Sequence, residues 1–348
     1  SVNMAAVRRA LILRTATFVS LGLATAAVLG LWWTSFGGNT AIIKSTELGF
    51  DNFAAAASPL VKQTMINNPD VRPVYELVGA LPPLPYGYDN RNKATPLKDT
   101  FGLSERGRVQ DASIDAYQTA LERLMRPRLV LSLEKELTRN INDPAYIYEA
   151  LKVYLMLGHK APFIDKELIL DWFSHEWEER VFPGAPYAQG RALLGAHLKA
   201  MLDMDTADTV KVSLNGPLVT QAQATLARMR VAQRAYTLLR SQARQELIED
   251  WVASQRGGPD VGLVFEAANG GGLDSVRVPG FFTYNGFYKG LLEHMPSIAG
   301  ALAKDNWVLG PSGEQSAVQQ QYERLFPDIL DLYSNDFIGA WNVAISNL

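Results

Sequence analysis

An uncharged run from Thr15 to Phe36, TATFVSLGLATAAVLGLWWTSF, constrains this chain more than any other feature. A helix rises about 1.5 Å per residue, so the run is long enough to cross a hydrocarbon core of about 30 Å. A cleaved signal peptide has a shorter apolar region, of about 7–15 residues, and small residues where it is cut. This run is longer and ends in the bulky pair Trp32 and Trp33. We therefore predict a transmembrane helix over residues 15–36.

The charges beside this run predict its orientation. Three basic residues precede it, namely Arg8, Arg9 and Arg14. No charged residue follows until Lys44. Basic residues stay on the cytoplasmic side of a membrane, so we expect the amino end inside and the rest of the chain outside. Trp32 and Trp33 are then expected at the outer interface, where aromatic side chains gather.

Two other interpretations of the same run are open. The pair Arg8–Arg9 is also found in twin-arginine signals, although the apolar run is long for one. A buried core helix is a further alternative, although an uncharged run of this length is unusual in a soluble core. Both are less consistent with the sequence than a membrane span.

Small residues recur along one side of the predicted span. Gly22, Ala26 and Gly30 are four residues apart and therefore lie on one helical face. Rows of small residues let helices approach closely in lipid. We expect this face to contact another transmembrane helix, from a second copy or a partner. The alternative is that alanine and glycine are simply frequent in this span.

Charge and cysteine content exclude several classes of function. The chain has 33 basic and 36 acidic residues, with a formal net charge of −3. No acidic residue precedes Arg14, so the remainder is more acidic than the whole and lacks the basic character of a nucleic-acid binder. With no cysteine, the chain has no disulfide, no thiolate metal ligand and no cysteine nucleophile.

The remaining sequence predicts a mainly α fold. Apolar residues recur at helical spacing over 41–67, 111–139, 165–180, 187–204, 218–254 and 315–348. Gly37–Gly38 is expected to break the first helix, and Pro327 to interrupt the last. Asp143 before Pro144 is the signature of a helix start. Asn215–Gly216–Pro217 predicts a turn that opens the helix over 218–254.

Glycine and proline mark the irregular parts. LPPLPYGYDN, residues 81–90, is expected to be extended or polyproline-like, as a stiff connection or as a partner ligand. VGLVFE (261–266) and SVRV (275–278) predict a small two-stranded β element around Gly270–Gly271–Gly272.

We divide the chain into five parts on this basis. These are a cytoplasmic basic tail (1–14), the transmembrane helix (15–36), a helical and Pro-rich connector (37–100), a helical periplasmic domain (101–255) and a mixed, then helical segment (256–348). The chain has no initiator methionine and stops inside an amphipathic pattern, so we expect a fragment of a longer protein.

No catalytic, cofactor or metal motif is present. The sequence has no GxxxxGK[ST], GxSxG, HExxH or EF-hand pattern, and its four histidines are not paired at ligand spacing. His175 lies among acidic residues, which is consistent with a general base or a solvated helix face. Helical enzymes that cleave cell-wall glycan need a glutamic acid in a cleft, for which Glu167 and Glu176 are the candidates. We expect no enzyme, no cofactor and no metal.

Several stretches resemble one known family. FGLSERGR, AYQTALERLMRPRLVLSLEKEL and DPAYIYEALKVYLMLGHKAPFIDKELILDWFSHEW, all within residues 101–177, are similar to the periplasmic part of the TssM/IcmF family. VPGFFTYNGF (278–287), NWVLG (306–310) and LYSNDFIGAW (332–341) also match, in the same order. In the fourth of these stretches, Gly280 and Gly286 flank aromatic residues. We expect a tight turn with positive φ that packs the aromatic rings against helices.

The resemblance implies a trans-envelope scaffold of the type VI secretion system in the bacterial inner membrane. Its partners would be further copies of itself, the inner-membrane protein TssL and, through a region beyond this chain, the outer-membrane lipoprotein TssJ. A membrane-anchored periplasmic enzyme acting on the cell wall is the alternative.

Overall fold

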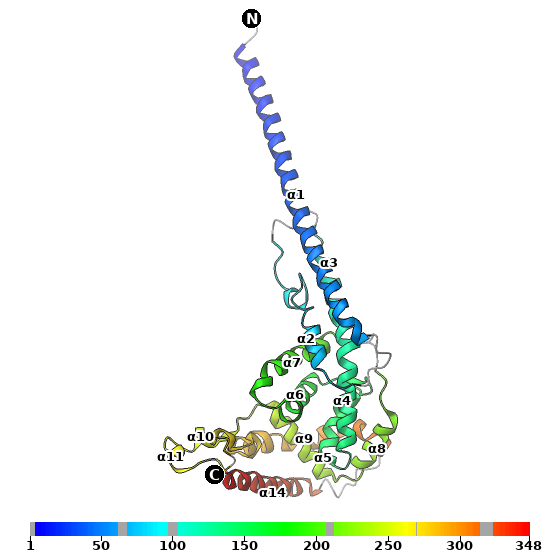
Figure 1. The fold of residues 1–348 in the computed structure, drawn as a ribbon, viewed down its shortest axis with the longest axis vertical. Helices are drawn as coiled ribbons and strands as arrows, with labels where there is room; N and C mark the ends of the chain where they lie inside the picture. Colours follow the sequence, from blue (N-terminus) through cyan, green and yellow to red (C-terminus); the bar gives the residue numbers. More distant parts are fainter. Residues whose placement is uncertain (1–3, 62–67, 97–103, 207–211, 269, 314–322) are drawn as a thin grey trace. The chain divides into compact units, whose positions relative to one another are not determined.

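The computed structural model describes residues 4–61, 68–96, 104–206, 212–268, 270–313 and 323–348 (Figure 1). The fold is mainly α-helical, with one two-stranded antiparallel sheet, as the sequence predicted. The chain divides into two compact units. The first comprises residues 1–66 and 71–125, and the second comprises residues 67–70 and 126–348.

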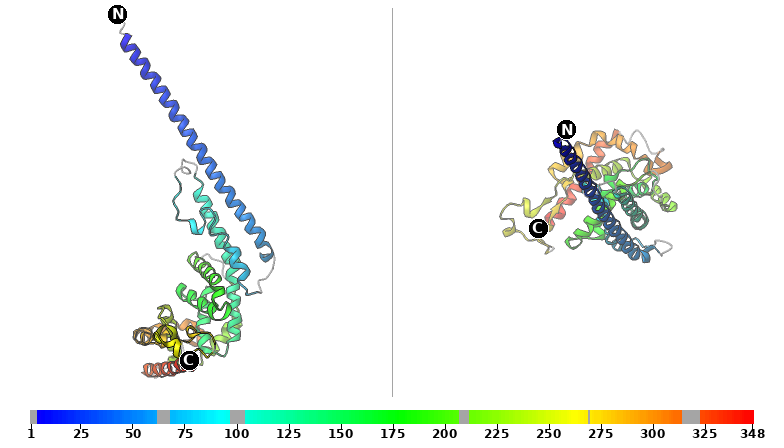
Figure 2. Two further views of the ribbon diagram at one scale, coloured as in Figure 1. Left: turned by 60° about the vertical axis from the view of Figure 1, so that its left-hand side comes forward. Right: turned by 90° about the horizontal axis from the view of Figure 1, so that it is seen from above.

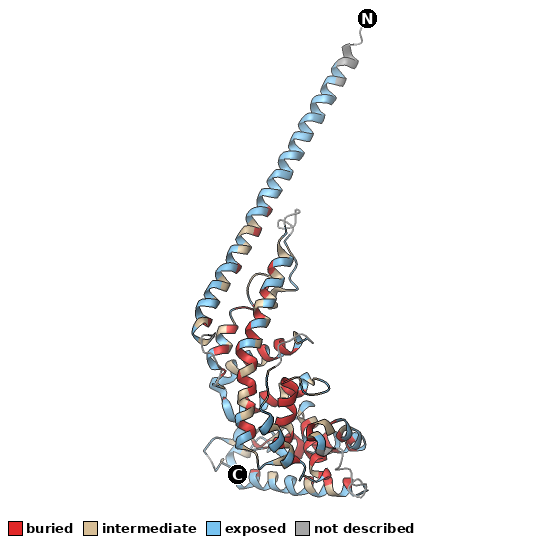
Figure 3. Cartoon of the chain, turned by 90° about the vertical axis from the view of Figure 1, so that its right-hand side faces the viewer, coloured by how far each residue is buried: buried red, intermediate tan, exposed pale blue. Residues whose placement is uncertain are grey.

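The first unit is organised on one long helix, α1 (Met4–Val61). Its first half is exposed along the apolar run, whereas its second half is partly buried (Figure 3). The buried positions of that second half are Ser35, Asn39, Thr46 and Ala57, and partly buried residues 42, 43, 50 and 53 fill the same side at three- and four-residue spacing. That spacing is typical of one helix packed lengthwise on another.

The helix that covers this face is α3 (Arg106–Ala120), which lies beside the second half of α1 (Figure 2). The two helices run parallel, and Asn39 Oδ1 accepts a hydrogen bond of 3.0 Å from the backbone N–H of Glu105 at the start of α3. The unit also contains α2 (Arg72–Val78), the 3-10 turn η1 (Tyr88–Asn90) and the π-helical turn η3 (Leu121–Met125).

The second unit is built around α5 (Pro144–Leu157), whose side chains from Tyr148 to Leu157 are buried except at Glu149. Asp143 caps this helix by accepting hydrogen bonds from the N–H groups of Ala145 and Tyr146. The helices around it are α4 (Arg126–Arg139), α6 (Lys166–Glu176), α8 (Gly216–Leu226) and α9 (Val231–Gln245). α7 (Ala188–Asp203) packs on α6, and the turns η4 (Trp177–Val181) and η5 (Ala185–Tyr187) join those two helices.

A hydrophobic core cluster is formed by α9 together with the sheet and the carboxy-terminal helix α14 (Leu325–Ser346). In the sheet, β1 (Trp251–Val252) pairs with β2 (Arg277–Val278), with Trp251 opposite Val278. The remaining elements are α10 (Ala253–Arg256), α11 (Val261–Val264), η6 (Leu273–Ser275), η7 (Gly280–Phe282), η8 (Gly286–Leu292), η9 (Met295–Ser297), α12 (Ile298–Lys304) and η10 (Asn306–Gly313).

Two predicted helix breaks are wrong. Gly37–Gly38 does not interrupt α1, because a glycine costs a helix only about 1 kcal/mol, and packing of Asn39 and Thr46 offsets that cost. Pro327 does not interrupt α14, because it is the third residue of the helix, where no backbone N–H is needed. The part of that predicted helix over 314–322 lies outside the described residues.

Three predicted segments are also corrected. Residues 218–254 form α8, α9, β1 and part of α10 rather than one helix. Residues 261–264 form the exposed turn α11 rather than a strand. The partner of β2 is Trp251–Val252, with Trp251 opposite Val278 and the buried Val252 opposite Arg277. Residues 81–90 fold into successive hydrogen-bonded turns, not an extended chain, since Gly87 donates to Leu84 and Asp89 donates to Pro82.

Candidate functional site

Helix α5 carries charged and hydroxyl groups into the core of the second unit, and each finds a partner there. Lys152 Nζ lies 2.7 Å from Asp305 Oδ2, and the Tyr148 hydroxyl donates to the same oxygen at 3.3 Å. Burial, followed by the nearby Asp305 carboxylate, raises the pKa of Tyr148, which keeps its hydroxyl a donor. One turn away, Glu149 Oε2 accepts from Arg244 Nη2 at 2.6 Å. These contacts tie α5 to α9 and to the end of α12.

Two of the stretches that carry the family resemblance lie at central positions in the second unit. Residues 148–157 are the central helix, and residues 306–310 follow the aspartate that its lysine binds. Removing one partner of a buried ion pair leaves an uncompensated charge, so loss of Lys152 or Asp305 alone would destabilise the second unit. The polar groups of α5 named above bind one another or groups on neighbouring helices, and they line neither of the two cavities described below.

Glu176, one of the two glutamates considered for catalysis, is 5% exposed at the end of α6. The Tyr146 hydroxyl donates to its Oε2 at 3.3 Å, and Arg180 Nε lies 3.7 Å from the same oxygen. Its Oε1 is buried and has no hydrogen-bond partner among the residues that the structure describes. Burial raises the pKa of this carboxyl from its ordinary value of 4.5, and the neighbouring Glu136 raises it further against the attraction of Arg180.

The raised pKa of Glu176 predicts how the stability of a Glu176→Gln variant depends on pH. A carboxyl with a raised pKa binds its proton more tightly in the folded protein than in the unfolded chain. Its contribution to stability is thus complete below the unfolded pKa and is lost as pH rises through the folded pKa. We expect the stability of the Gln variant to fall less than that of the wild type between pH 4.5 and neutral pH. Thermal unfolding at several pH values measures this.

Glu167→Gln is the matched control, because Glu167 is an exposed carboxylate in the first turn of the same helix. Identical pH profiles for the wild type and Glu176→Gln would contradict the prediction.

Glu176 lines neither of the two cavities described below. The exposed His175 lies 3.2 Å from the exposed Glu179. No group of three or more His, Asp or Glu placed to hold a metal occurs among the residues that the structure describes.

The residues singled out in the predicted span all lie on α1. Arg8, Arg9 and Arg14 are exposed near its start, and Trp32 and Trp33 are exposed at the end of the apolar run. Of the described helices, α1 alone is long and apolar enough to cross a membrane.

Gly22, Ala26 and Gly30 are exposed, and a Cβ built on either glycine would meet no atom within 4 Å. At 3.6 residues per turn, their row continues along α1 through the exposed Gly37 and Ala41. It lies opposite the face that packs on α3 and contacts nothing among the described residues, so this side of the helix is open.

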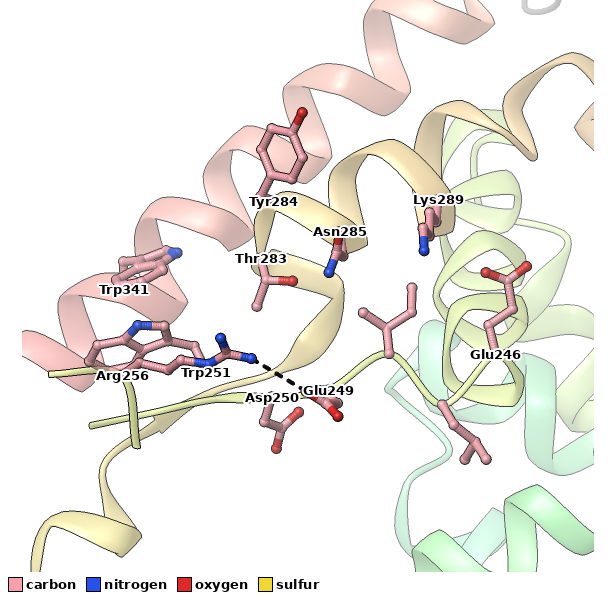
Figure 4. Close-up of a pocket in the computed structure, with 12 residues that line it drawn as sticks. Glu246, Glu249, Asp250, Trp251, Arg256, Thr283, Tyr284, Asn285, Lys289 and Trp341 are labelled. Carbon is pink, nitrogen blue, oxygen red and sulfur yellow. Dashed lines mark hydrogen bonds and ion pairs between the residues drawn. The ribbon is translucent and has the colours of Figure 1, made fainter. Parts of the chain in front are cut away.

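The larger cavity, of about 540 Å³, lies in the second unit where α9 ends (Figure 4). One side is the segment from Glu246 to Trp251, and the other is the segment from Thr283 to Lys289. Trp341 of α14 and Arg256 complete the lining, with the Trp251 and Trp341 ring centroids 5.2 Å apart. The sequence did not reveal this cavity, because no motif marks residues 246–251.

Two glycines permit close backbone contacts beside this cavity, Gly280 with the opposite wall and Gly286 within its own segment. A Cβ on Gly280 would lie 2.0 Å from the carbonyl oxygen of Ile248, and one on Gly286 would lie 2.1 Å from the carbonyl oxygen of Gly280. Neither glycine has positive φ, which corrects the expected turn: they are needed for close backbone approach. Phe281 and Phe282 are buried, as expected, whereas Tyr284 is 76% exposed.

A smaller groove, of about 340 Å³, lies in the first unit between α1 and α3. Its floor is apolar, and its rim carries Glu47, Glu105 and Arg108. Arg108 and Glu105 form an exposed ion pair of 3.1 Å, a kind of contact that contributes little to stability. The groove is a surface between two packed helices and holds no convergent polar groups.

These features define a class of protein: a mainly helical chain with one helix that can cross a membrane and a helical body joined to it. Comparison with known proteins assigns it further. The family described as "IcmF-related: Intracellular multiplication and human macrophage-killing" matches residues 76–348, and the chain belongs to that family.

One curated relative is the type VI secretion system component TssM1 of Pseudomonas aeruginosa strain PAO1. It is 29% identical over 325 residues, which cover 92% of this chain. The chain spans only 27% of the length of that relative. No solved structure matches the chain.

Proposed function

We propose that this chain is a scaffold subunit of a type VI secretion membrane complex, which anchors the complex in the bacterial inner membrane and spans the periplasm. The observation that carries the proposal is the continuity of α1, whose exposed apolar half runs without a break into the half that packs on α3. Membership of the IcmF-related family and similarity to TssM1 supply the secretion system.

The orientation follows from the charges on α1. Arg8, Arg9 and Arg14 favour a cytoplasmic amino end, so the residues beyond Phe36 are periplasmic. Trp32 and Trp33 are the anchors at the outer interface. A long helix that leaves the bilayer without a linker suits a subunit whose membrane part and periplasmic part act together.

The proposed partners are further copies of the chain, TssL in the inner membrane and TssJ at the outer membrane, the last through a region beyond residue 348. The open face of Gly22, Ala26 and Gly30 is the proposed contact with another transmembrane helix. Its continuation through the small residues Gly37 and Ala41, on the side of α1 opposite α3, supports this. The exposed Trp33 lies on the same side, between Gly30 and Gly37.

The orientation is tested by a reporter fused after Gly258, which lies in an exposed turn. Alkaline phosphatase, which folds only outside the cytoplasm, is expected to be active there, because the arginines hold the amino end inside. β-Galactosidase fused at the same residue is the matched control and is expected to be inactive. The opposite pattern would reverse the proposed topology.

A cell-wall enzyme is not favoured. Such an enzyme would need an acid in a cleft, whereas Glu176 is enclosed by Tyr146, Glu136 and Arg180. Secretion by cells that carry Glu176→Gln is therefore expected to be normal at normal protein abundance. Loss of secretion with an intact complex would favour the enzyme instead.

A further inference from the structure

The cavity between residues 246–251 and 283–289 has a volume in the range of about 300–1,000 Å³ that holds small ligands. Polar side chains converge on it from separate segments of the chain. Asn285 and Lys289 point from one wall toward the segment before β1, which carries Glu249 and Asp250 (Figure 4). The aromatic pair Trp251 and Trp341 closes one end.

The two walls carry opposite charges. Lys289 has no carboxylate within 4.0 Å, and the Asn285 amide has no hydrogen-bond partner, within the described ranges of the chain. Across the cavity, Asp250 uses one carboxylate oxygen to accept the Gly280 N–H, and its other oxygen is 3.8 Å from Arg277. Glu249 is 85% exposed and pairs at 3.3 Å with the exposed Arg256. A free ammonium therefore faces a pair of carboxylates that have capacity to accept more hydrogen bonds.

The backbone around the cavity is unusual on both sides. Leu247 has a φ of 51° at the end of α9, where many helices take a left-handed conformation, although a leucine there is uncommon; its side chain is 84% exposed. The opposite wall continues into η8, which is π-helical over seven residues from Gly286 to Leu292. Strained backbone and π-helical segments both occur preferentially at functional sites.

We propose that this cavity binds a short peptide that carries both a free carboxylate and a free amine. The carboxylate would bind Lys289 and Asn285, and the amine would bind Glu249 and Asp250. Two sources supply this chemistry: the peptide stems of the cell wall and a segment of another protein. The cell-wall source rests on the periplasmic placement proposed above, whereas the site itself does not.

Titration calorimetry on the full chain in detergent tests the site. The two probes are the stem tripeptide alanyl-γ-D-glutamyl-diaminopimelate and the all-L tripeptide Ala-Glu-Lys. We expect binding of at least one probe by the wild type and about tenfold weaker binding by Lys289→Met, because a hydrogen bond to a charged group is lost. Lys304→Met removes an exposed lysine outside the cavity and is expected to bind as the wild type does.

The outcomes separate the site from its source. Tighter binding of the stem tripeptide supports the cell wall, and equal or tighter binding of the all-L tripeptide supports a protein segment. No binding of either probe at about 10 mM, or equal binding by Lys289→Met and the wild type, overturns the site. The unfolding temperature of each variant shows that it is folded. Because purified protein is used, a negative result leaves the proposed membrane anchoring and secretion role untouched.

Discussion

Gly280→Ala is expected to destabilise the second unit by about 3 kcal/mol or more. The added Cβ would lie 2.0 Å from the carbonyl oxygen of Ile248 and 3.1 Å from that of Glu249. Both are backbone atoms, so no side-chain rotation relieves the overlap. The segment before β1 would have to separate from η7, and the packing of Phe281 and Phe282 behind it would loosen. Thermal or denaturant unfolding of the full chain in detergent measures the loss.

Gly300→Ala is the matched control for this substitution. Gly300 lies inside α12, and a Cβ there would meet no atom within 4 Å. Alanine is the better helix former, so this variant should be unchanged or more stable by about 0.5–1 kcal/mol. A Gly280→Ala protein as stable as the wild type would show that the two segments do not approach as closely as described.

Gly22→Ile combined with Ala26→Ile is expected to disassemble the membrane complex. The two positions lie on the open face of α1, where we propose that another transmembrane helix packs closely. Large side chains would force the helices apart, at a cost of about 1–3 kcal/mol for each overpacked contact. Insertion should be normal, because the substitutions add apolar surface. Native mass measurement of complexes extracted in detergent reports the number of copies that remain.

Val28→Phe provides the control for this pair, because Val28 is exposed on the opposite side of α1 and also gains bulk there. Complexes of this variant should keep the stoichiometry of the wild type. Unchanged stoichiometry in the double isoleucine variant would show that Gly22 and Ala26 face only lipid.

Local chemistry was sufficient to predict several helix starts. Asp143 and Asn215 cap α5 and α8 through hydrogen bonds to nearby N–H groups, and a proline follows each in the first turn. These signals depend on a few neighbouring residues, so they can be read from sequence. The helix over the apolar run was equally clear from the sequence, because an uncharged run of that length has no helix breaker other than glycine; its place in a membrane stays a prediction.

The break after α9 could not be read in the same way. The helix stops at Gln245 because Leu247 takes a positive φ, which is unusual for leucine and carries no sequence signature. The strand that follows is fixed by distant contacts, since Val252 is buried opposite residues 277–278. The cavity depends on both, so residues such as Lys289 and Glu249 could be brought together only by the folded chain.

The continuity of α1 also affects how motion would be transmitted along it. Its 58 residues form a stiff rod of about 87 Å, and the hydrogen bond from Glu105 to Asn39 fastens α3 to that rod just beyond the apolar run. If residues 15–36 cross the bilayer as proposed, a flexible tether after them would absorb any turning or sliding of that span. Under the proposed membrane placement, a continuous helix would instead pass torque or piston-like displacement at Gly22 on to Asn39. The two adjacent glycines at 37 and 38 are the most compliant point on that route, and their stiffness sets how much of the displacement is transmitted.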